Sequence, residues 1–586
     1  ITSMVNQNLY SQCCHKQNYH YQYCSQMTHL LLCTLILLTL SFPAVYYGMQ
    51  QEIAIKFCIY NNNGNDIEIN AFKSDDGTHY VFLPSYAKME SVEYRGDAPS
   101  IVIDGQELTI GTNCRSFELN KNYSLTTDED TRICFLHSAS VATISIQTQS
   151  GNMDYIHSNK YEKESASLLL LDQNGALNCL DEVCTINLRG NSTSQGHDKK
   201  PYLVTLSKEK DLLDMGSASK WVLLANAFDA SNIRNKLALE LGRLADMEWV
   251  PECEFVDVYL NGNYNGLYLL TEKVEIGKDR LNIDANSGDF LCRIDFAWRW
   301  DTFNNPFLTD NERTVEIVDP KYISEDEKAA IINKVNDMER RILQGDYDDI
   351  IDVDSFARRY LIDEIVANND SDVGINYFYC SNGVFYSGPL WDYDATLGSG
   401  YYTENPQSFI ARNHVRYKQY DALYNSALYN NKTFYQRMTE IYRNEFLPIL
   451  SSFLSGEIEN ISKTISASAY MNAFRWGLAL DEHENQAIRI ADYLNKRVDF
   501  LNSAWIDNVE YCTVRFDIYN SGIYWNTSIE KGKTLEQMPE YIKSVYDNDE
   551  SIEWVNKDTG APYRMGWAYW PSAYQREVWE YNCLLA

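Results

Sequence analysis

The sequence is short of positive charge and of histidine. Its 586 residues include 50 Lys and Arg against 82 Asp and Glu, a formal net charge of −32, and only nine His. A chain this acidic repels nucleic-acid phosphates, and no basic stripe offsets the deficit. We therefore expect a solvated acidic surface and no nucleic-acid partner.

Common catalytic and metal-binding motifs are also missing. The nine His do not cluster, the 14 Cys contain no CxxC pair, and no HExxH, GxSxG or Walker A string occurs. These absences remove the usual signals of zinc proteases, triad serine hydrolases and P-loop NTPases. Cys114 with Cys134, and Cys179 with Cys184, are candidate disulfides in an oxidising compartment, and single buried thiols are an equal alternative.

The N-terminal region contains a long uncharged stretch. No charge occurs between Lys16 and Glu52, and Leu30 to Leu40 is an almost unbroken apolar run. This run has the length of a signal-peptide core, and extending it through Tyr47 reaches the length of a membrane span. We therefore expect residues 1–50 to hold a signal peptide or a membrane anchor at residues 29–47. The mature part is then extracellular or anchored at the cell surface.

The chain as a whole has the composition of a folded protein of roughly three or four domains, with 45% apolar and 23% charged residues. Short strands between Asn, Gly and Asp turns predict a β-rich domain at 51–148, and mixed strands and helices predict a second domain at 149–508. Residues 509–586 return to strands and resemble the small β-grasp repeats of bacterial surface proteins. The expected fold class is α+β.

Within 149–508, several elements are recognisable. Helical spacing of apolar residues predicts a helix that begins near Asp229 or Ser231 and another at about 354–367, and amphipathic helices fill roughly 433–505. The turn Asn261-Gly262 between two apolar runs is a strong hairpin signal.

Residues 185 to 400 carry, in a workable order, the groups that phosphoryl transfer needs. These are backbone amides and a cation for the phosphates, a carboxylate near the acceptor hydroxyl, and acidic ligands for Mg²⁺. The turn that contains Arg189 and Asn191 lies between two predicted strands, where it can meet phosphates. In the second strand, Lys200 shares the parity of the apolar residue Tyr202 and is expected to point inward, whereas Lys199 is expected to be solvated.

Two groups of acidic residues follow. Asp392 and Asp394 share one face of an extended segment at roughly 7 Å, so they repel unless a divalent cation bridges them or one is protonated. Asp370 and Asp372 lie in a loop that leads to Asn376, and either is a candidate catalytic carboxylate. A carboxylate, an Asn a few residues later and a metal-binding carboxylate after one more strand is the order found in protein kinases.

At these residues the sequence resembles the CotH-type atypical kinases related to spore coat protein H. The matching strings occur in the family's order across about 149 to 508, and together they are highly specific. They are Leu188–Thr193 (LRGNST), Lys199–Tyr202 (KKPY), Leu223–Asn226 (LLAN), Ile233–Asn235 (IRN), Val258–Gly262 (VYLNG), Asn265–Lys273 (NGLYLLTEK), Asn368–Asp370 (NND) and Gly388–Asp394 (GPLWDYD).

The resemblance implies an atypical protein-kinase-like domain, flanked by the two small β-rich domains, that binds ATP and Mg²⁺ (or Mn²⁺). Such an exported kinase would transfer the ATP γ-phosphate to Ser or Thr of surface or secreted proteins. Arg234 and Asn235 match the family motif, but each can equally fix the helix to the sheet, and Glu240 is a possible partner of Lys200. Carried onto this chain, the roles are catalytic carboxylate for Asp370, metal ligands for Asp392, Asp394 and Asn376, phosphate contacts for Lys200, Arg189 and Asn191, and an adenine contact for Glu272.

Two other functions fit some of the same features. A catalytically silent surface adhesin or scaffold that keeps the kinase-like fold would explain the aromatic, acidic and modular composition. The retained carboxylates argue against it, because a pure binding module has no need of an Asp pair. A carbohydrate-active enzyme would also use paired carboxylates and Trp and Tyr side chains, and it is the least favoured interpretation.

Overall fold

The computed structural model describes residues 54–585, except 62–63, 127–129, 369, 372–375, 400–404, 413–422, 519–523, 534–551 and 557–578. The chain divides into two units, Ile1–Ile53 and Ala54–Ala586, and all described residues belong to the second. The signal peptide or anchor expected at residues 1–50 therefore lies outside the described part. Within that part, no helix combines the length and the apolar character needed to cross a membrane.

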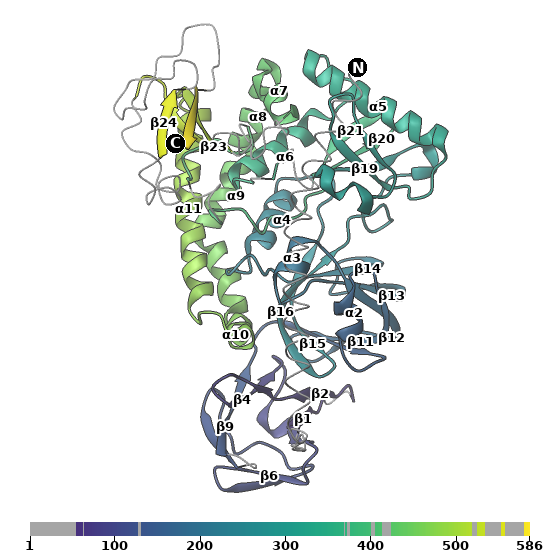
Figure 1. Ribbon diagram of the computed structural model, residues 1–586, viewed down its shortest axis with the longest axis vertical. Helices are drawn as coiled ribbons and strands as arrows, with labels where there is room; N and C mark the ends of the chain where they lie inside the picture. The colour runs from purple at the N-terminus through teal and green to yellow at the C-terminus, as the bar shows by residue number, and fades with distance from the viewer. Residues whose placement is uncertain are drawn as a thin grey trace, which may run out of the picture. The chain divides into compact units, whose positions relative to one another are not determined.

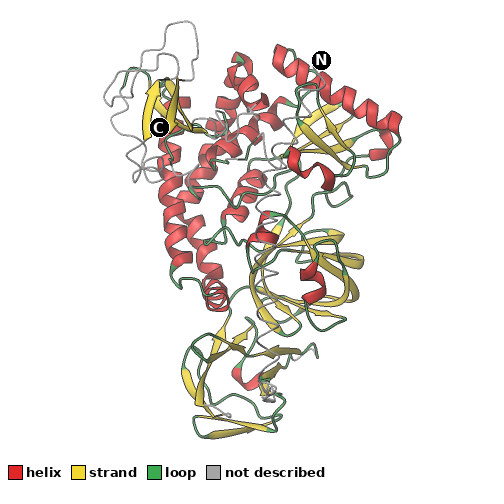
Figure 2. Ribbon diagram, in the orientation of Figure 1, coloured by secondary structure: helices red, strands yellow, loops and turns green. Residues whose placement is uncertain are grey.

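Strands and helices are mixed along the described chain, which confirms the expected α+β class (Figure 2). The first strands form a three-stranded sheet in the order β2–β1–β5 and a six-stranded sheet in the order β3–β4–β9–β8–β6–β7. Both sheets contribute to one apolar core. The strands are β1 (Lys56–Ile59), β2 (Ile67–Asn70), β3 (Phe72–Lys73), β4 (Thr78–Leu83), β5 (Val92–Tyr94), β6 (Ser100–Ile103), β7 (Gln106–Thr109), β8 (Asn122–Thr126) and β9 (Asp130–His137).

A closed barrel of seven strands follows, in the order β10–β11–β12–β13–β14–β16–β15. Strand β10 (Ala142–Thr148) lies within the predicted first β-rich domain but belongs to the barrel, because it pairs with β11 and, in parallel, with β15. This pairing removes the open sheet edge that β15 would otherwise present. The other barrel strands are β11 (Glu164–Leu171), β12 (Leu177–Leu188), β13 (Tyr202–Asp211), β14 (Ser217–Leu224), β15 (Cys253–Leu260) and β16 (Asn263–Glu272).

The barrel is filled by every second residue of its strands, as strand alternation requires. Val204, Trp221 and Leu270 are among the buried residues of the barrel core. The β15–β16 hairpin turns at Asn261 and Gly262, whose φ angles of +50° and +77° suit the tight turn that the sequence predicts.

The cysteines that were candidates for disulfides are thiols in the structure. Cys114 and Cys134 lie in the core of the first two sheets, and Cys179 and Cys184 lie in the barrel core. Burial raises the pKa of Cys114 to about 12, so this thiol stays protonated and unreactive at neutral pH. Of the two alternatives left open by the sequence, the structure has the buried thiols.

Helix α4 (Arg234–Leu244) lies between the barrel strands β14 and β15, and a five-stranded sheet in the order β18–β19–β17–β20–β21 follows the barrel. Helix α5 (Glu325–Gln344) begins at a capping box made by Ser324 and Glu327 and ends at Gly345, whose φ is +74°. Helix α6 (Val353–Ile365) is buried along most of its length. The strands of this sheet are β17 (Phe290–Ile294), β18 (Pro306–Leu308), β19 (Thr314–Asp319), β20 (Asn376–Ser381) and β21 (Val384–Ser387).

A run of helices completes this part of the chain and confirms the amphipathic pattern of residues 433 to 505. The long helices α10 (Ile458–Trp476) and α11 (Glu482–Trp505) pack side by side (Figure 1). They are preceded by α7 (Leu423–Asn430), α8 (Lys432–Ile441) and α9 (Leu447–Ser452).

The chain ends in a mixed four-stranded sheet in the order β23–β22–β25–β24, with β22 and β25 parallel. This sheet is compatible with the predicted β-grasp-like module, which otherwise stays a prediction. Its strands are β22 (Tyr511–Ile518), β23 (Tyr524–Glu530), β24 (Ile552–Asn556) and β25 (Trp579–Leu585).

A buried ion pair connects α6 to α11. Glu364 and Arg497 are both fully buried, and the guanidinium donates to the Glu364 carboxylate and, from Nε, to the Glu364 carbonyl at 2.9 Å. The same carboxylate accepts backbone N–H bonds from Ile410 at 2.6 Å and Arg412 at 3.0 Å. Because the hydrogen-bonding capacity of both ions is used, the desolvation of the pair is compensated.

We predict that Arg497→Met lowers the free energy of unfolding by about 3–5 kcal/mol, because it leaves the Glu364 carboxylate buried and without its cation. Arg489→Met on the same helix is the control, since the Arg489 side chain is 67% exposed and its pair with Glu482 is long, at 3.6 Å. The control is expected to change stability by no more than about 0.5 kcal/mol. Urea unfolding of both variants measures the difference, and equal losses would contradict the account of α6 and α11.

Candidate functional site

The loop that follows β21 carries the two predicted metal ligands. Trp391 and Tyr393 are buried, whereas Asp392 is exposed and Asp394 is half-buried, so aromatic and acidic side chains alternate as expected. Asp392 has a φ of +69°, a left-handed conformation that Asp tolerates better than most residues. Strained backbone of this kind is concentrated at functional sites.

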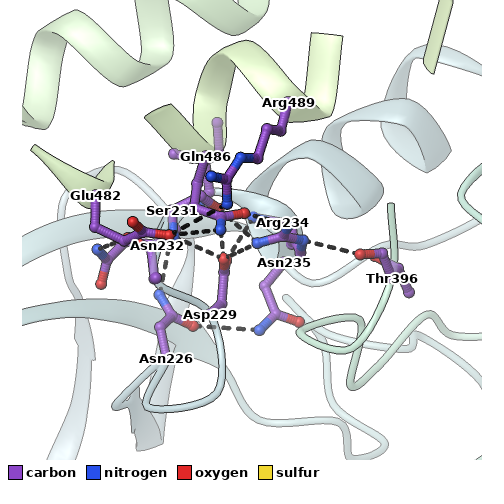
Figure 3. A network of polar contacts seen from close by, with 12 residues as sticks. Asn226, Asp229, Ser231, Asn232, Arg234, Asn235, Thr396, Glu482, Gln486 and Arg489 are labelled. Carbon is purple, nitrogen blue, oxygen red and sulfur yellow. Dashed lines mark hydrogen bonds and ion pairs between the residues drawn. The ribbon is translucent and has the colours of Figure 1, made fainter. Parts of the chain in front are cut away.

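Helix α4 holds this loop from one side. The Asn235 side chain accepts the Tyr393 backbone N–H at 2.8 Å, and Arg234 Nε donates to the Thr396 carbonyl at 2.8 Å. Arg234 also forms a buried ion pair with Asp229, which lies just before the helix and accepts the Arg234 backbone N–H at 2.9 Å (Figure 3). The family-motif residues Arg234 and Asn235 thus fix the acidic loop to α4.

Helix α6 holds the same loop from the other side. The Tyr393 hydroxyl donates to Asp363 Oδ1 at 2.8 Å. Asp363 is 1% exposed, and it also accepts the side chains of Asn368 at 2.9 Å and Ser371 at 2.7 Å. One carboxylate therefore contacts both the acidic loop and the loop of the predicted catalytic residue.

The predicted catalytic residue Asp370 lies in that second loop and is half-buried. Its backbone N–H donates to Asn368 Oδ1 at 3.0 Å, and its carbonyl accepts Asn376 Nδ2 at 3.0 Å. The Asn376 side-chain oxygen accepts a hydrogen bond from Arg359. The amide of Asn376 is thus used on both sides as a tether of the Asp370 loop. Asp372, the alternative catalytic residue, lies outside the described residues.

The two acidic side chains face an electrostatic cost that nearby arginines relieve only in part. Desolvation by the surrounding protein raises the pKa of Asp392. The nearby Arg189 guanidinium lowers this pKa, and the nearby Asp295 carboxylate raises it. Desolvation and the nearby carboxylates of Asp392, Asp229 and Asp370 raise the pKa of Asp394 well above its usual range. Neither carboxylate accepts a hydrogen bond or forms an ion pair with any residue that the structure describes. Such carboxylates are suited to a cation.

Arg189 lies beside these carboxylates. Its guanidinium stacks on the Trp391 ring at 5.3 Å from the centroid and is close enough to Asp392 to lower the pKa of that carboxyl. Burial lowers the pKa of Arg189. Among the described residues, no oxygen accepts a hydrogen bond from this guanidinium. A desolvated guanidinium with unused donors is suited to an anion such as a phosphate.

The two neighbouring lysines differ from the expectation. Lys199 is 7% exposed, donates to the Leu267 carbonyl at 2.5 Å and lies over the Tyr268 ring, so the prediction of a solvated Lys199 is wrong. Lys200 is half-buried and donates to the Ser194 carbonyl at 2.8 Å. Strand parity failed here because β13 begins only at Tyr202, after both lysines.

Two further predicted residues lie in other surroundings. Asn191 accepts Lys160 Nζ at 3.0 Å, just before the short helix α3 (Ser192–Gly196). Glu240 pairs with Arg243 on α4 rather than with Lys200.

Glu272 is also fully engaged within the protein. Its carboxylate forms a buried pair with Arg280 and accepts the Glu252 backbone N–H at 2.7 Å. Burial raises the pKa of Glu272 to about 7. Both carboxylate oxygens therefore have protein partners, and no contact joins Glu272 to Arg189 or Asp392 among the described residues.

Sequence reasoning did not assign a role to Asp363. Its signal was the pair Arg359 and Asp363, spaced i, i+4 on the helix predicted at about 354–367. Charged residues on a buried helix face need partners, and that requirement would have pointed to the loops at the end of α6.

The acidic side chains do not form a complete metal cage by themselves. Within the described residues, no three His, Cys, Asp or Glu side chains converge closely enough to hold a metal ion. Mg²⁺ usually takes one or two carboxylates and fills its remaining positions with water and substrate phosphates. The two open carboxylates of Asp392 and Asp394 fit that donor set.

Comparisons with known proteins point to one family. The sequence profile of the family described as CotH kinase protein matches residues 186–501, more than half of the chain. Inner spore coat protein H of Bacillus subtilis (strain 168) is 28% identical over 242 residues, or 38% of this chain. The match spans 61% of the length of that relative.

The buried Lys199 predicts a specific pH dependence of stability. Burial lowers its pKa to about 7, against about 10.4 in an unfolded chain, so the unfolded state binds more protons between these values. The free energy of unfolding should therefore rise between pH 7 and pH 10, by about 1.4 kcal/mol per unit of pKa difference.

Lys199→Met should remove this rise, because the side chain no longer titrates. Lys163→Met, at an exposed position just before β11, is the control and should keep it. Urea unfolding at pH 7, 8.5 and 10 makes the comparison. Parallel pH profiles of the wild type and Lys199→Met would show that Lys199 is not desolvated as described.

Proposed function

The chain belongs to the CotH kinase protein family, and on this premise we propose that it is an atypical protein kinase that transfers the ATP γ-phosphate to Ser or Thr. One observation carries the proposal. Arg189, with unused hydrogen-bond donors, lies next to Asp392, which together with the nearby Asp394 has unused acceptors, and the Asp370 loop is tied to the same place. A magnesium–phosphate group supplies both missing partners.

In this proposal Asp392 and Asp394 hold Mg²⁺, or Mn²⁺, through their open carboxylate oxygens. When bound, the metal neutralises negative charge on the phosphates. Arg189 donates to phosphate oxygens, and its stacking on Trp391 keeps the guanidinium in place without using its donors. Lys200 and Asn191 stay predictions as further phosphate contacts, and so does Glu272 as an adenine contact.

Asp370 is the proposed base. It accepts the proton of the acceptor hydroxyl as the oxygen of that hydroxyl bonds to the γ-phosphorus. The bond from phosphorus to the bridging oxygen breaks, and ADP leaves with its electron pair. Asn376 holds the Asp370 backbone through the 3.0 Å bond to its carbonyl, so the base is kept near the metal-binding carboxylates.

Export and a surface location belong to the same proposal. They are supported by the uncharged N-terminal stretch and by similarity to a protein named as an inner spore coat protein. The acceptor would then be a surface, coat or secreted protein.

We predict that Asp392→Asn abolishes the Mg²⁺-dependent stabilisation by ATP. Ligand at a hundred times its Kd adds about 2.7 kcal/mol to the stability of the wild type, and a neutral amide cannot hold the cation. Differential scanning fluorimetry with ATP, with and without Mg²⁺, measures the shift. Asp310→Asn, at an exposed aspartate, is the control and should keep it.

We predict a different result for Asp370→Asn. This variant should keep the Mg·ATP-dependent shift and lose phosphoryl transfer about 10²–10⁴-fold, because only the base is removed. Transfer of ³²P from ATP to protein measures it. A wild type that gives no thermal shift with Mg·ATP would contradict the kinase proposal and favour the silent scaffold.

A further inference from the structure

Asp363 is a buried carboxylate whose oxygens are all engaged by side chains. Oδ1 accepts the Tyr393 hydroxyl at 2.8 Å and Asn368 Nδ2 at 2.9 Å. Oδ2 accepts Arg359 Nε at 2.8 Å and the Ser371 hydroxyl at 2.7 Å. Four bonds fill the acceptor capacity of a carboxylate, so its negative charge is fully compensated.

These partners come from separate segments. Asn368 and Ser371 flank Asp370, while Tyr393 lies between Asp392 and Asp394. The Asp363 backbone carbonyl adds a bond from the Asn368 N–H at 2.7 Å. Both loops are therefore attached to the last turn of α6.

We infer that Asp363 is a positioning residue that sets the separation between Asp370 and the pair Asp392 and Asp394. The inference rests on the proposed function for its catalytic meaning, because a base and a metal site must hold one geometry for in-line transfer. Asp363 acts through the Tyr393 hydroxyl on one side and through Ser371 on the other.

Tyr393 is the mildest place to break this connection. The Tyr393 side chain is fully buried, and its hydroxyl donates to Asp363 Oδ1 at 2.8 Å. Tyr393→Phe removes that one bond and keeps the ring in its buried position. Tyr347→Phe is the matched control, since the buried Tyr347 hydroxyl has no hydrogen-bond partner among the described residues.

The test is hydrogen exchange of the full chain without nucleotide, followed by peptide mass spectrometry. Loss of a hydrogen bond to a charged acceptor should raise the opening equilibrium of residues 368–371 about tenfold in Tyr393→Phe. Tyr347→Phe should leave these amides unchanged. Ser371→Ala is the reciprocal variant and should increase exchange in residues 391–397.

Kinetics separate positioning from a general loss of structure. In Tyr393→Phe, kcat should fall about tenfold or more while the KM for Mg·ATP changes less than about twofold. The inference would be overturned if exchange stayed unchanged both in residues 368–371 of Tyr393→Phe and in residues 391–397 of Ser371→Ala. Hydrogen exchange needs no activity, so it tests whether Asp363 connects the two loops even if the wild type binds no Mg·ATP. Absence of Mg·ATP binding would count against the proposed function alone.

Discussion

Two carboxylates buried side by side at the end of α6 organise the part of the protein that contains the candidate site. Asp363 and Glu364 are 1% and 0% exposed, so each must be compensated inside the protein. Asp363 is compensated by Arg359 and by the two loops that carry the acidic site residues. Glu364 is compensated by Arg497 and by backbone N–H groups of residues 410 and 412. Because both buried charges at this helix end need partners, Asp363 holds the two site loops in place and Glu364 holds α6 against α11.

The same accounting of charges separates structural from functional residues. Asp229 with Arg234, Glu272 with Arg280, and Glu364 with Arg497 are buried pairs that satisfy one another. Arg189, Asp392 and Asp394 differ, because the described residues supply none of them with a hydrogen bond. Opposite charges that lie close together without bonding leave room for a ligand with both signs of charge, which a metal–phosphate group has.

The sequence was sufficient for much of the fold and for the chemistry of the acidic loop. Apolar periodicity located α6 and the helices after residue 433, the Asn261-Gly262 turn located the β15–β16 hairpin, and the alternation of Trp391 and Tyr393 with Asp392 and Asp394 predicted their burial. These features depend on residues close together in the chain.

Features that depend on distant pairing were not predictable in this way. Strand β10 joins the barrel through β15, more than a hundred residues away, and nothing local to residues 142–148 reveals that partner. The prediction for the buried Lys199 failed because β13 starts two residues after Lys200, so strand parity does not apply to either lysine. Asp363 gained its role only when the loops at 368–371 and 391–394 were brought to the same helix end.

The most direct test of the central claim is a crystal structure with Mg²⁺ and a non-hydrolysable ATP analogue. The account predicts that the cation lies in contact with the Asp392 carboxylate and that Arg189 donates to a phosphate oxygen. It also predicts that Asp363 keeps its bonds to Tyr393 and Ser371. A nucleotide bound elsewhere, with Asp392 and Arg189 making no contact to it, would contradict the account.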